Sequence, residues 1–255
     1  MKKFKIIITY ELVFILILGS LCFFKTKDYL AFSMNSWGLS FKDPSNPNPN
    51  VSKDELLKYN AYYQGDTTSN FLYLTFDCGY EAGYTNNILD TLKKYDIKAT
   101  FFVVGHYLKS ASDIVLRMIN EGHNVCNHTY SHPNMSKINN ETLVKEINKL
   151  EDAFNLLTNS KLIKYYRPPA GVYSYEQLEV IKKLGYKTIF WSVAYKDYDK
   201  NNQYSENKAL ELLSKRTHKG AIILLHNTSK TNALVLDNYL EKMISEKYLF
   251  KLIDF

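Results

Sequence analysis

Residues 71–79 read Phe-Leu-Tyr-Leu-Thr-Phe-Asp-Cys-Gly, a short β-rich apolar run that ends in a carboxylate and a glycine. Such runs recur along the chain and alternate with segments of helical periodicity. The others lie at 99–104, 123–126, 162–166, 187–193, 221–225 and 248–253. Strands that alternate with helices through short connections predict a parallel sheet. So many units in one domain favour closure, and we expect an α/β fold, a distorted (β/α) barrel with about seven parallel strands.

The helices between these strands are predicted at 85–95, 111–120, 140–157, 175–184, 205–216 and 232–246. Gly122, Gly185 and Gly220 stand just before strands, at positions where a helix C-cap needs left-handed backbone. In a barrel of this kind the reactive side chains lie on loops at the C-terminal ends of the strands. The polar residues that follow the apolar runs are therefore the candidates for a functional site.

The composition limits the partners and the covalent framework. The formal net charge of the 255 residues is +6, and the lysines are scattered over the predicted helices. No block of basic residues resembles a nucleic-acid patch, so we expect no nucleic-acid partner. Three cysteines, Cys22, Cys78 and Cys126, are too few for a disulfide framework. We expect Cys126 in the core, with a Cys78–Cys126 disulfide as the alternative.

The N-terminus has the order of an export signal. Three lysines within residues 2–5 precede an apolar stretch at residues 6–24. The stretch reaches about the ~20 residues that span a bilayer. Residues 1–33 are therefore expected to be a signal peptide or an uncleaved membrane anchor. The rest of the chain would lie outside the cytoplasm, at the outer face of the membrane or in the cell wall.

The remainder divides into an extension and a main domain. Residues 34–69 are expected to be a linker and N-terminal extension, and residues 70–255 the functional domain. Within the extension, residues 43–50 read Asp-Pro-Ser-Asn-Pro-Asn-Pro-Asn. Because proline removes a backbone donor and fixes φ, we expect this segment to form neither helix nor sheet.

The first polar groups at strand ends are a carboxylate and a pair of histidines. Asp77 ends the first strand, and His128 and His132 follow the third. Two imidazoles four residues apart can face one metal ion if their segment is helical or tightly looped. Two histidines with one oxygen or sulfur ligand suit a catalytic divalent ion, Zn²⁺ or another first-row transition metal. The sequence thus predicts a metal cofactor.

Two further strand ends complete the set. Arg167 begins an Arg-Pro-Pro-Ala-Gly segment after the fourth strand, in which the prolines fix the backbone and Gly171 permits close approach. His226 follows the apolar sixth strand directly, and Asp197 is placed to orient its imidazole. Since all these groups follow strands of one sheet, we expect them to point into the same mouth.

These motifs resemble those of the polysaccharide deacetylases of the NodB-homology type, carbohydrate esterase family 4. The resemblance covers residues 71–255 and all five family motifs, in order. Within the family it is strongest to deacetylases of peptidoglycan N-acetylmuramic acid, through Ser36-Trp37-Gly38, the Gly79-Tyr80-Glu81 motif and residues 190–194. It implies removal of N-acetyl groups from muramic residues of peptidoglycan, on the route to the muramic δ-lactam of spore cortex. The partner would be the glycan strand, and no protein partner is inferred.

The resemblance also implies roles for single residues. Asp77 would be the general base, held in its working orientation by Arg167. His226 would be the general acid, oriented by Asp197, and the two histidines after the third strand would hold the metal. The residues expected to contact the substrate are Ala170, whose backbone N–H would complete the oxyanion site, Leu224 and Tyr198, which would line the acetyl pocket, and Trp191.

The sequence departs from the family pattern at two positions. Cys78 stands where many members have a second aspartate that ligates the metal, and Tyr198 stands where many have tryptophan. Cys78 is either a thiolate ligand that would favour zinc or a small buried residue that ligates nothing. The remaining histidines, His106, His123 and His218, are expected at the surface or at helix ends.

Two alternative functions stay open from the sequence. The acetamido group is the same in N-acetylglucosamine polymers and chitin, so motifs at the reaction centre allow those substrates too. A non-catalytic wall-binding protein that lost its metal at Cys78 is the other alternative. The presence of both a base, Asp77, and an acid, His226, argues against it, because a binding protein needs neither.

Overall fold

The computed structural model describes residues 34–41, 43 and 47–255. The predicted export segment at residues 6–24, with the rest of residues 1–33, lies outside the described residues. Within the described part of the chain, no helix is long and apolar enough to cross a membrane. Residues 36–255 form one compact unit, which contains every candidate site residue.

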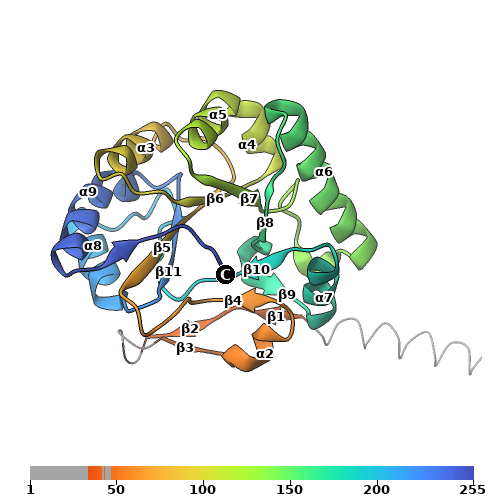
Figure 1. Ribbon diagram of the computed structural model, residues 1–255, viewed down its shortest axis with the longest axis horizontal. Helices are drawn as coiled ribbons and strands as arrows, with labels where there is room; N and C mark the ends of the chain where they lie inside the picture. The colour runs from red at the N-terminus through yellow and green to blue at the C-terminus, as the bar shows by residue number, and fades with distance from the viewer. Residues whose placement is uncertain (1–33, 42, 44–46) are drawn as a thin grey trace, which may run out of the picture. The chain divides into compact units, whose positions relative to one another are not determined.

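A curled parallel sheet forms the centre of this unit, with helices around its outer side (Figure 1). Its hydrogen-bonded order is β11-β5-β6-β7-β8-β10-β4, with β12 paired to β5, and every pair is parallel. The strands are β4 (Ala61–Tyr62), β5 (Phe71–Cys78), β6 (Thr100–Val103), β7 (Asn124–Asn127), β8 (Ile163–Tyr166), β10 (Lys187–Ile189), β11 (Ile222–His226) and β12 (Leu249–Phe250). The expected distorted barrel is confirmed.

The helices of the barrel are α3 (Thr85–Lys94), α4 (Gly105–Ser110), α5 (Ser112–Asn120), α6 (Asn140–Thr158), α7 (Tyr175–Lys183), α8 (Glu206–Arg216) and α9 (Lys230–Ser245). Short 3-10 turns, η1 (Met135–Lys137) and η2 (Pro169–Gly171), and a two-residue strand, β9 (Val172–Tyr173), lie in the connections. Six helices match the predicted segments within two residues at each end. Helix α4 was not predicted, because six residues without a side-chain cap carry little periodic signal.

Two of the three predicted glycine C-caps are confirmed. Gly122 and Gly185 each lie one residue beyond the C-cap residue of α5 and α7, and both have φ of +81°. Gly220 also has a positive φ, +75°, but it lies four residues after α8 ends. Its N–H donates to the carbonyl of Phe71, so it forms the turn into β11 rather than a helix cap.

The N-terminal extension is part of the folded unit. It contains β1 (Asn35–Ser36), β2 (Leu39–Ser40), β3 (Asn48–Pro49) and α2 (Lys53–Leu57). Strand β4, at its end, pairs with β10 and so adds a strand to the barrel sheet. The expectation that residues 43–50 form no sheet is wrong, because Asn48 and Pro49 pair with β2 in antiparallel register. A proline is tolerated in this two-stranded ribbon because a ribbon edge leaves one side of each strand without ladder bonds.

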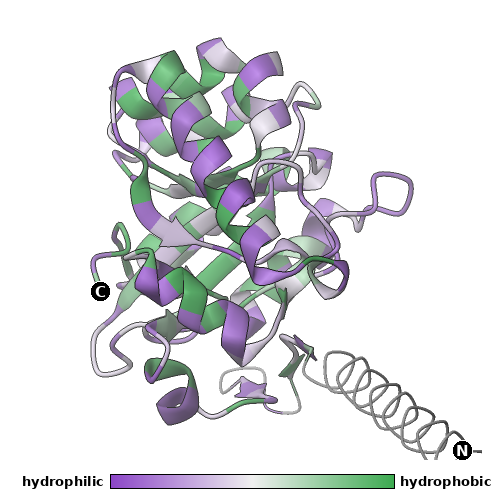
Figure 2. Cartoon of the chain, turned by 90° about the vertical axis from the view of Figure 1, so that its right-hand side faces the viewer, coloured by the Kyte–Doolittle hydropathy of each residue, from purple (hydrophilic) through white to green (hydrophobic). Residues whose placement is uncertain are grey.

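The sheet separates two apolar layers, and several of its strands are coloured as hydrophobic in Figure 2. Successive side chains of a strand point to opposite faces, so β5 contributes to both. Leu74, Phe76 and Cys78 belong to the core between sheet and helices, whereas Tyr73 belongs to the core inside the barrel, together with Cys126. Cys126 is buried, as expected. Because the two cysteines lie in different layers, both are free thiols, and the Cys78–Cys126 disulfide considered from the sequence is wrong.

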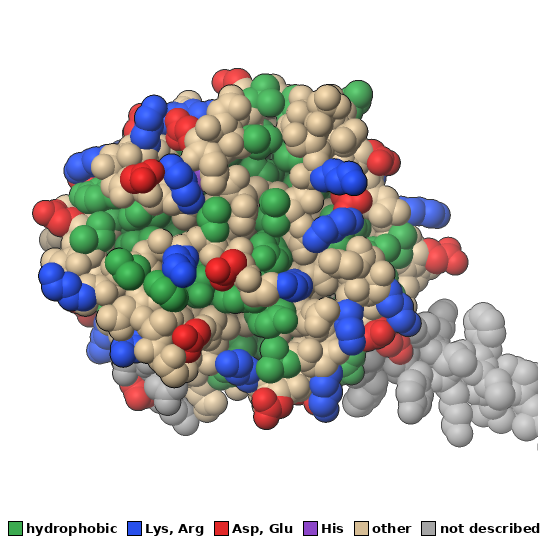
Figure 3. Space-filling model, in the orientation of Figure 1, with side chains coloured by type: hydrophobic (Ala, Val, Ile, Leu, Met, Phe, Trp, Pro, Cys, Tyr) green, Lys and Arg blue, Asp and Glu red, His purple; other side chains and the backbone are tan. Residues whose placement is uncertain are grey.

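Charged side chains of both signs cover the exterior. On the face shown in Figure 3, Lys and Arg are interspersed with Asp and Glu. Several are paired across or along helices, such as Lys94 with Asp237 at 2.7 Å and Arg117 with Glu121 at 2.9 Å. This distribution is typical of a solvated protein surface.

Candidate active site

The candidate site lies where the barrel strands end. Asp77 and His226 are direct partners in the β5–β11 ladder, and both point to the inner side of the barrel. They border a cavity of about 450 Å³. The cavity is lined by Asp77, His128, His132, Ala170, Gly171, Trp191, Ala194, Tyr195, Tyr198, Leu224 and His226. The structure therefore gathers the predicted site residues at one mouth, with Arg167 and Asp197 behind the lining residues and Cys78 outside.

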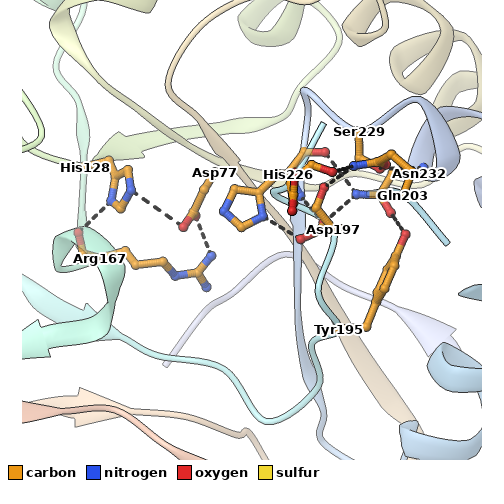
Figure 4. Close-up of polar contacts among 10 residues, drawn as sticks. Asp77, His128, Arg167, Tyr195, Asp197, Gln203, His226, Ser229 and Asn232 are labelled. Carbon is orange, nitrogen blue, oxygen red and sulfur yellow. Dashed lines mark hydrogen bonds and ion pairs between the residues drawn. The ribbon is translucent and has the colours of Figure 1, made fainter. Parts of the chain in front are cut away.

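Asp77 is held by a buried cation. Nη1 of Arg167 donates to its Oδ1 at 2.7 Å, and the arginine side chain is fully buried (Figure 4). The guanidinium is fixed in turn by the carbonyls of Ile189 and Phe190, at 3.0 and 3.2 Å, and by the ring of Phe102. Burial alone would raise the pKa of Asp77, but Arg167 and the neighbouring imidazoles outweigh it and hold the pKa below its ordinary value. Asp77 is thus a carboxylate at neutral pH.

His128 and His132 lie in a tight loop rather than on a helix. Both Thr129, with φ of 66°, and His132, with φ of 53°, have left-handed backbone in this loop. The side chain of Asn127 accepts the Thr129 N–H at 2.9 Å, which stabilises this left-handed turn. The two imidazole rings are 4.9 Å apart and nearly perpendicular. Of the two arrangements that the spacing allows, the chain uses the loop.

The electrostatics of this pair suit a metal ion. Nδ1 of His128 lies 2.8 Å from the carbonyl of Arg167, which fixes the tautomer with the proton on Nδ1 and leaves the Nε2 lone pair free. Nε2 lies 3.6 Å from Oδ2 of Asp77. Burial lowers the pKa of His128 to about 4 and also lowers the pKa of His132. Both are neutral imidazoles, the state that ligates. Within the described residues no three His, Cys, Asp or Glu side chains form a metal-binding group, so the fit is of two histidine ligands only.

His226 is held by a buried carboxylate. Its Nδ1 lies 2.8 Å from Oδ1 of Asp197, and its backbone N–H donates to Oδ2 at 2.7 Å. Burial lowers the pKa of His226, but Asp197 overcomes this effect and leaves the pKa above its ordinary value. Asp197 therefore stabilises the protonated imidazole relative to that of an ordinary histidine, with Nδ1 facing the carboxylate and Nε2 available to the cavity.

Asn232 completes this half of the site and was missed from the sequence. Its Nδ2 donates to Oδ2 of Asp197 at 2.6 Å and to the backbone carbonyl of His226 at 3.0 Å. The hydroxyl of Tyr195 donates to its side-chain oxygen (Figure 4). The only sequence signal is an amide in the first turn of the helix that follows His226.

A second missed network joins the loops after β5 and β11. Asn227 is fully buried, and its Nδ2 donates to the carbonyl of Tyr80 and to Oγ1 of Thr85, each at 3.0 Å. Glu81 accepts from the Gly83 N–H at 2.6 Å and also bonds the Thr85 hydroxyl. The Gly79-Tyr80-Glu81 motif thus has a structural purpose, which is to hold the loop after Asp77 against the loop after His226.

The substrate-facing wall includes strained backbone. Ala170 has φ of 53° and ψ of 17°, a left-handed conformation that alanine rarely adopts. Gly171 follows with φ of +67°, and a Cβ there would meet the ring of Trp191 at 2.9 Å. Leu224 points inward from β11, and Tyr198 is 64% exposed at the rim with its ring 6.1 Å from that of His226. Strain of this kind is found at functional sites.

Cys78 does not reach the cavity. It follows Asp77 in an extended strand, so its side chain points to the opposite face, into the core beneath the helices. Burial raises the pKa of its thiol well above the ordinary value, which disfavours a thiolate. This placement favours the interpretation of Cys78 as a small buried residue over a metal ligand.

The other histidines lie outside the site. His106 is exposed on α4, as expected, and His218 follows the end of α8. His123 lies at the end of α5, one of the two expected positions, and its backbone N–H donates to the carbonyl of Met118, but only 7% of it is exposed, so it is not a surface residue. Its Nδ1 accepts the Ala99 N–H at 3.1 Å, and burial lowers its pKa to about 4. His123 is a neutral core residue.

A buried carboxylate and an imidazole thus border one cavity at the mouth of a parallel barrel, an arrangement that suits hydrolysis by acid and base groups. The sequence profile described as polysaccharide deacetylase matches residues 64–189. The chain is 40% identical to the peptidoglycan-N-acetylmuramic acid deacetylase PdaA of Bacillus subtilis over 223 residues, 86% of this chain and 84% of PdaA. The chain belongs to the polysaccharide deacetylase family, carbohydrate esterase family 4, and is a hydrolase that acts on amide bonds.

Solved structures agree with this assignment. The structure of B. subtilis PdaA matches with a TM-score of 0.82 and 38% identity, covering 87% of this chain and 95% of PdaA. A peptidoglycan-N-acetylglucosamine deacetylase of Bacillus cereus is 34% identical over 67% of this chain and 61% of its own length. BA3943 of Bacillus anthracis, a pseudoenzyme of the same family, matches with a TM-score of 0.71 and 26% identity, over 76% of this chain and 67% of its own.

Proposed function

We propose that this protein removes the N-acetyl group from N-acetylmuramic acid residues of peptidoglycan, on the route to the muramic δ-lactam of spore cortex. The similarity to PdaA, in sequence and in fold, supports this substrate. The observation that carries the proposed chemistry is the pair of groups at one cavity: Asp77, ion-paired with Arg167, and His226, whose Nδ1 faces the buried carboxylate of Asp197.

The chain's own residues account for the proton transfers. An amide carbonyl is a poor electrophile and an amine is a poor leaving group, so hydrolysis needs both a base and an acid. Asp77 takes a proton from the attacking water. The Ala170 N–H donates to the oxygen that gains negative charge on the former carbonyl. His226 then gives its proton from Nε2 to the departing nitrogen, and the products are acetate and a free amino sugar.

The two histidines of the 128–132 loop fit the metal that the family resemblance implies, because both are neutral and Nε2 of His128 faces the cavity. We propose Zn²⁺ or another first-row transition metal there. A divalent ion would polarise the acetamido carbonyl and lower the pKa of water. Chelation should abolish acetate release, and a divalent metal should restore it. Full activity in a metal-free preparation would remove the metal from the proposal.

The proposed place of action is outside the cytoplasm. The substrate is an extracellular polymer, and residues 2–24 have the charge and hydropathy order of an export signal. We infer that the segment is a cleaved signal or an anchor. A reporter fused after Asn50 should be active only outside the cytoplasm, and activity confined to the cytoplasm would refute export.

The N-acetylglucosamine alternative is favoured by one observation, the 34% identity to a deacetylase of that sugar. Mass spectrometry of glycan fragments, after incubation with intact and with peptide-stripped peptidoglycan, separates the two. Loss of acetyl from muramic residues supports the proposal, and loss from glucosamine residues alone contradicts it. No acetate release from any glycan would favour a non-catalytic wall-binding protein.

A further inference from the structure

A second pocket adjoins the catalytic cavity. Its volume is about 430 Å³, and it shares Trp191, Ala194, Tyr195 and Tyr198 with the catalytic cavity. The two are therefore neighbouring compartments with a common wall. None of the catalytic roles assigned above uses the second one.

Its far wall is built by two parts of the chain that the sequence places far apart. The N-terminal extension contributes Phe41, and α8 contributes Lys208 and Arg216. Lys208 and Arg216 are eight residues apart, so they share one face of the helix. The extension thus has a second purpose besides completing the sheet, because it closes a pocket beside the active site.

Arg216 is the fixed cation of this pocket. Its Nη1 donates to the Ala194 carbonyl at 2.5 Å, and its guanidinium lies 4.1 Å from the centre of the Phe41 ring. The two lysines of the pocket already contact carboxylates: Lys196 lies 3.7 Å from Asp199, and Lys208 lies 2.9 Å from Glu211. Among the described residues that line the pocket, none is Asp or Glu.

We propose that the second pocket binds the carboxylate of a 3-O-lactyl substituent on the sugar that is being deacetylated. In muramic acid the acetamido group and the lactyl ether stand on adjacent ring carbons. When the acetamido group occupies the catalytic cavity, the lactyl group enters the neighbouring compartment. There its carboxylate accepts hydrogen bonds from Arg216, which is held flat for this purpose by Phe41 and Ala194. This subsite rests on the proposed function, and through Arg216 it would select a sugar that carries a lactyl carboxylate.

The exposed aromatic rings that line the second pocket offer a rival occupant. Tyr198 is 64% exposed and Tyr204 40% exposed, and a neighbouring sugar of the glycan strand would stack on such rings. A stacked sugar needs no charged group in the pocket. The cationic side of the pocket favours the carboxylate, and the two occupants predict different responses to removal of charge.

The test pairs variants with substrates. Peptide-stripped glycan strands are prepared with free lactyl carboxylates or with the same groups converted to carboxamides. The wild type should favour the free carboxylate. Arg216→Gln should lower kcat/KM on the carboxylate glycan by about 10-fold or more, and hardly at all on the carboxamide glycan, since hydrogen bonds to charged groups are the strong ones. Arg216→Lys should be intermediate. Lys215→Gln, on the same helix but outside the pocket, is the matched control for net charge.

Equal losses on the two glycans would overturn the proposal, since Arg216 would then act only by holding Ala194 or by leaving room for a stacked sugar. If Arg216→Gln fails to fold, the wild type still decides, because equal rates on both glycans exclude a carboxylate subsite. Acetate release from N-acetylglucosamine oligomers alone would contradict the proposed function instead. In that case calorimetric affinities for N-acetylmuramic acid and N-acetylglucosamine decide: tighter muramic binding lost in Arg216→Gln supports the subsite, and equal affinities overturn it.

Discussion

The two sides of the active-site mouth have opposite arrangements of charge. On the β5 and β8 side, a buried cation, Arg167, holds a carboxylate; on the β10 and β11 side, a buried carboxylate, Asp197, holds an imidazole. The pKa of Asp77 is lowered and that of His226 is raised. The two shifts favour the carboxylate at Asp77 and the protonated imidazole at His226, which are the states that the proposed base and the proposed acid need.

The difference between the two sides lies in their exposure. Arg167 is fully buried and Asp77 nearly so, whereas the side chain of His226 is 26% exposed. The proposed base is thus almost enclosed by protein and meets the cavity at one edge, and the proposed acid stands where a leaving group can reach it. A substitution of Asp77 should consequently lower both the rate of deacetylation and the free energy of unfolding. A substitution of His226 should lower mainly the rate.

Asp77→Asn should have the largest effect. Without a base, acetate release should fall by about 10⁴-fold, the upper end for loss of a general base. Arg167 would keep a polar neighbour but lose its counter-charge, and breaking a buried pair in this way costs about 3–5 kcal/mol. Acetate release and the free energy of unfolding measure the two effects. Bound metal should remain, since Asp77 is proposed as base and not as ligand, and activity within tenfold of the wild type would contradict its role.

His226→Gln should rank second. Loss of the acid should lower kcat by about 10²–10³-fold, because solvent at this more exposed position supplies part of the missing proton. Stability should change less than in Asp77→Asn, and comparing the two unfolding free energies tests the difference in exposure. A substrate with a better leaving group should recover much of the lost rate. No recovery would show that His226 acts otherwise than on the departing nitrogen.

The sequence predicted this comparison in part. Asp77, His128, Arg167 and His226 follow apolar strands, and the rule that strand ends converge in a barrel was enough to place them together. The supporting amides were missed, since Asn227 and Asn232 acquire their roles only through partners distant in sequence. The two-residue strand β4 and the six-residue helix α4 are too short to show a period.

The position of Cys78 follows from the alternation of side chains along a strand. Once Asp77 was assigned to the inner face, the two-residue period of a strand placed its neighbour on the outer face. His123 is a different case, because its burial depends on a hydrogen bond from Ala99, which belongs to another strand connection. No local pattern separates such a core histidine from a surface one.

Asp197→Asn should have a moderate effect that appears mainly in the pH profile. His226 is active as the protonated acid, so activity falls as pH rises through its pKa. Burial lowers that pKa and Asp197 raises it. Without the carboxylate, burial prevails, and the alkaline limb of kcat/KM should move to lower pH. The pH dependence of kcat/KM, which reports free-enzyme pKa values, measures the shift. An unchanged alkaline limb, or a shift to higher pH, would contradict the pairing.

Substitution of Cys78 should have the smallest effect. It tests whether β5 supplies only the carboxylate of Asp77 to the site, or also a sulfur ligand for the metal. Its side chain is fully buried in the helix-side core, and its thiol is held protonated. Cys78→Ala should therefore leave metal stoichiometry and acetate release within about twofold of the wild type. Cys78→Ser should be similar in activity but less stable by about 1–3 kcal/mol, since it buries a hydroxyl among apolar side chains. A sharp loss of bound metal in both variants, with the fold intact by circular dichroism, would instead mean that β5 rotates to present sulfur to the ion. Cys126→Ala, on the inner face but away from the cavity lining, is the matched control for a lost buried thiol.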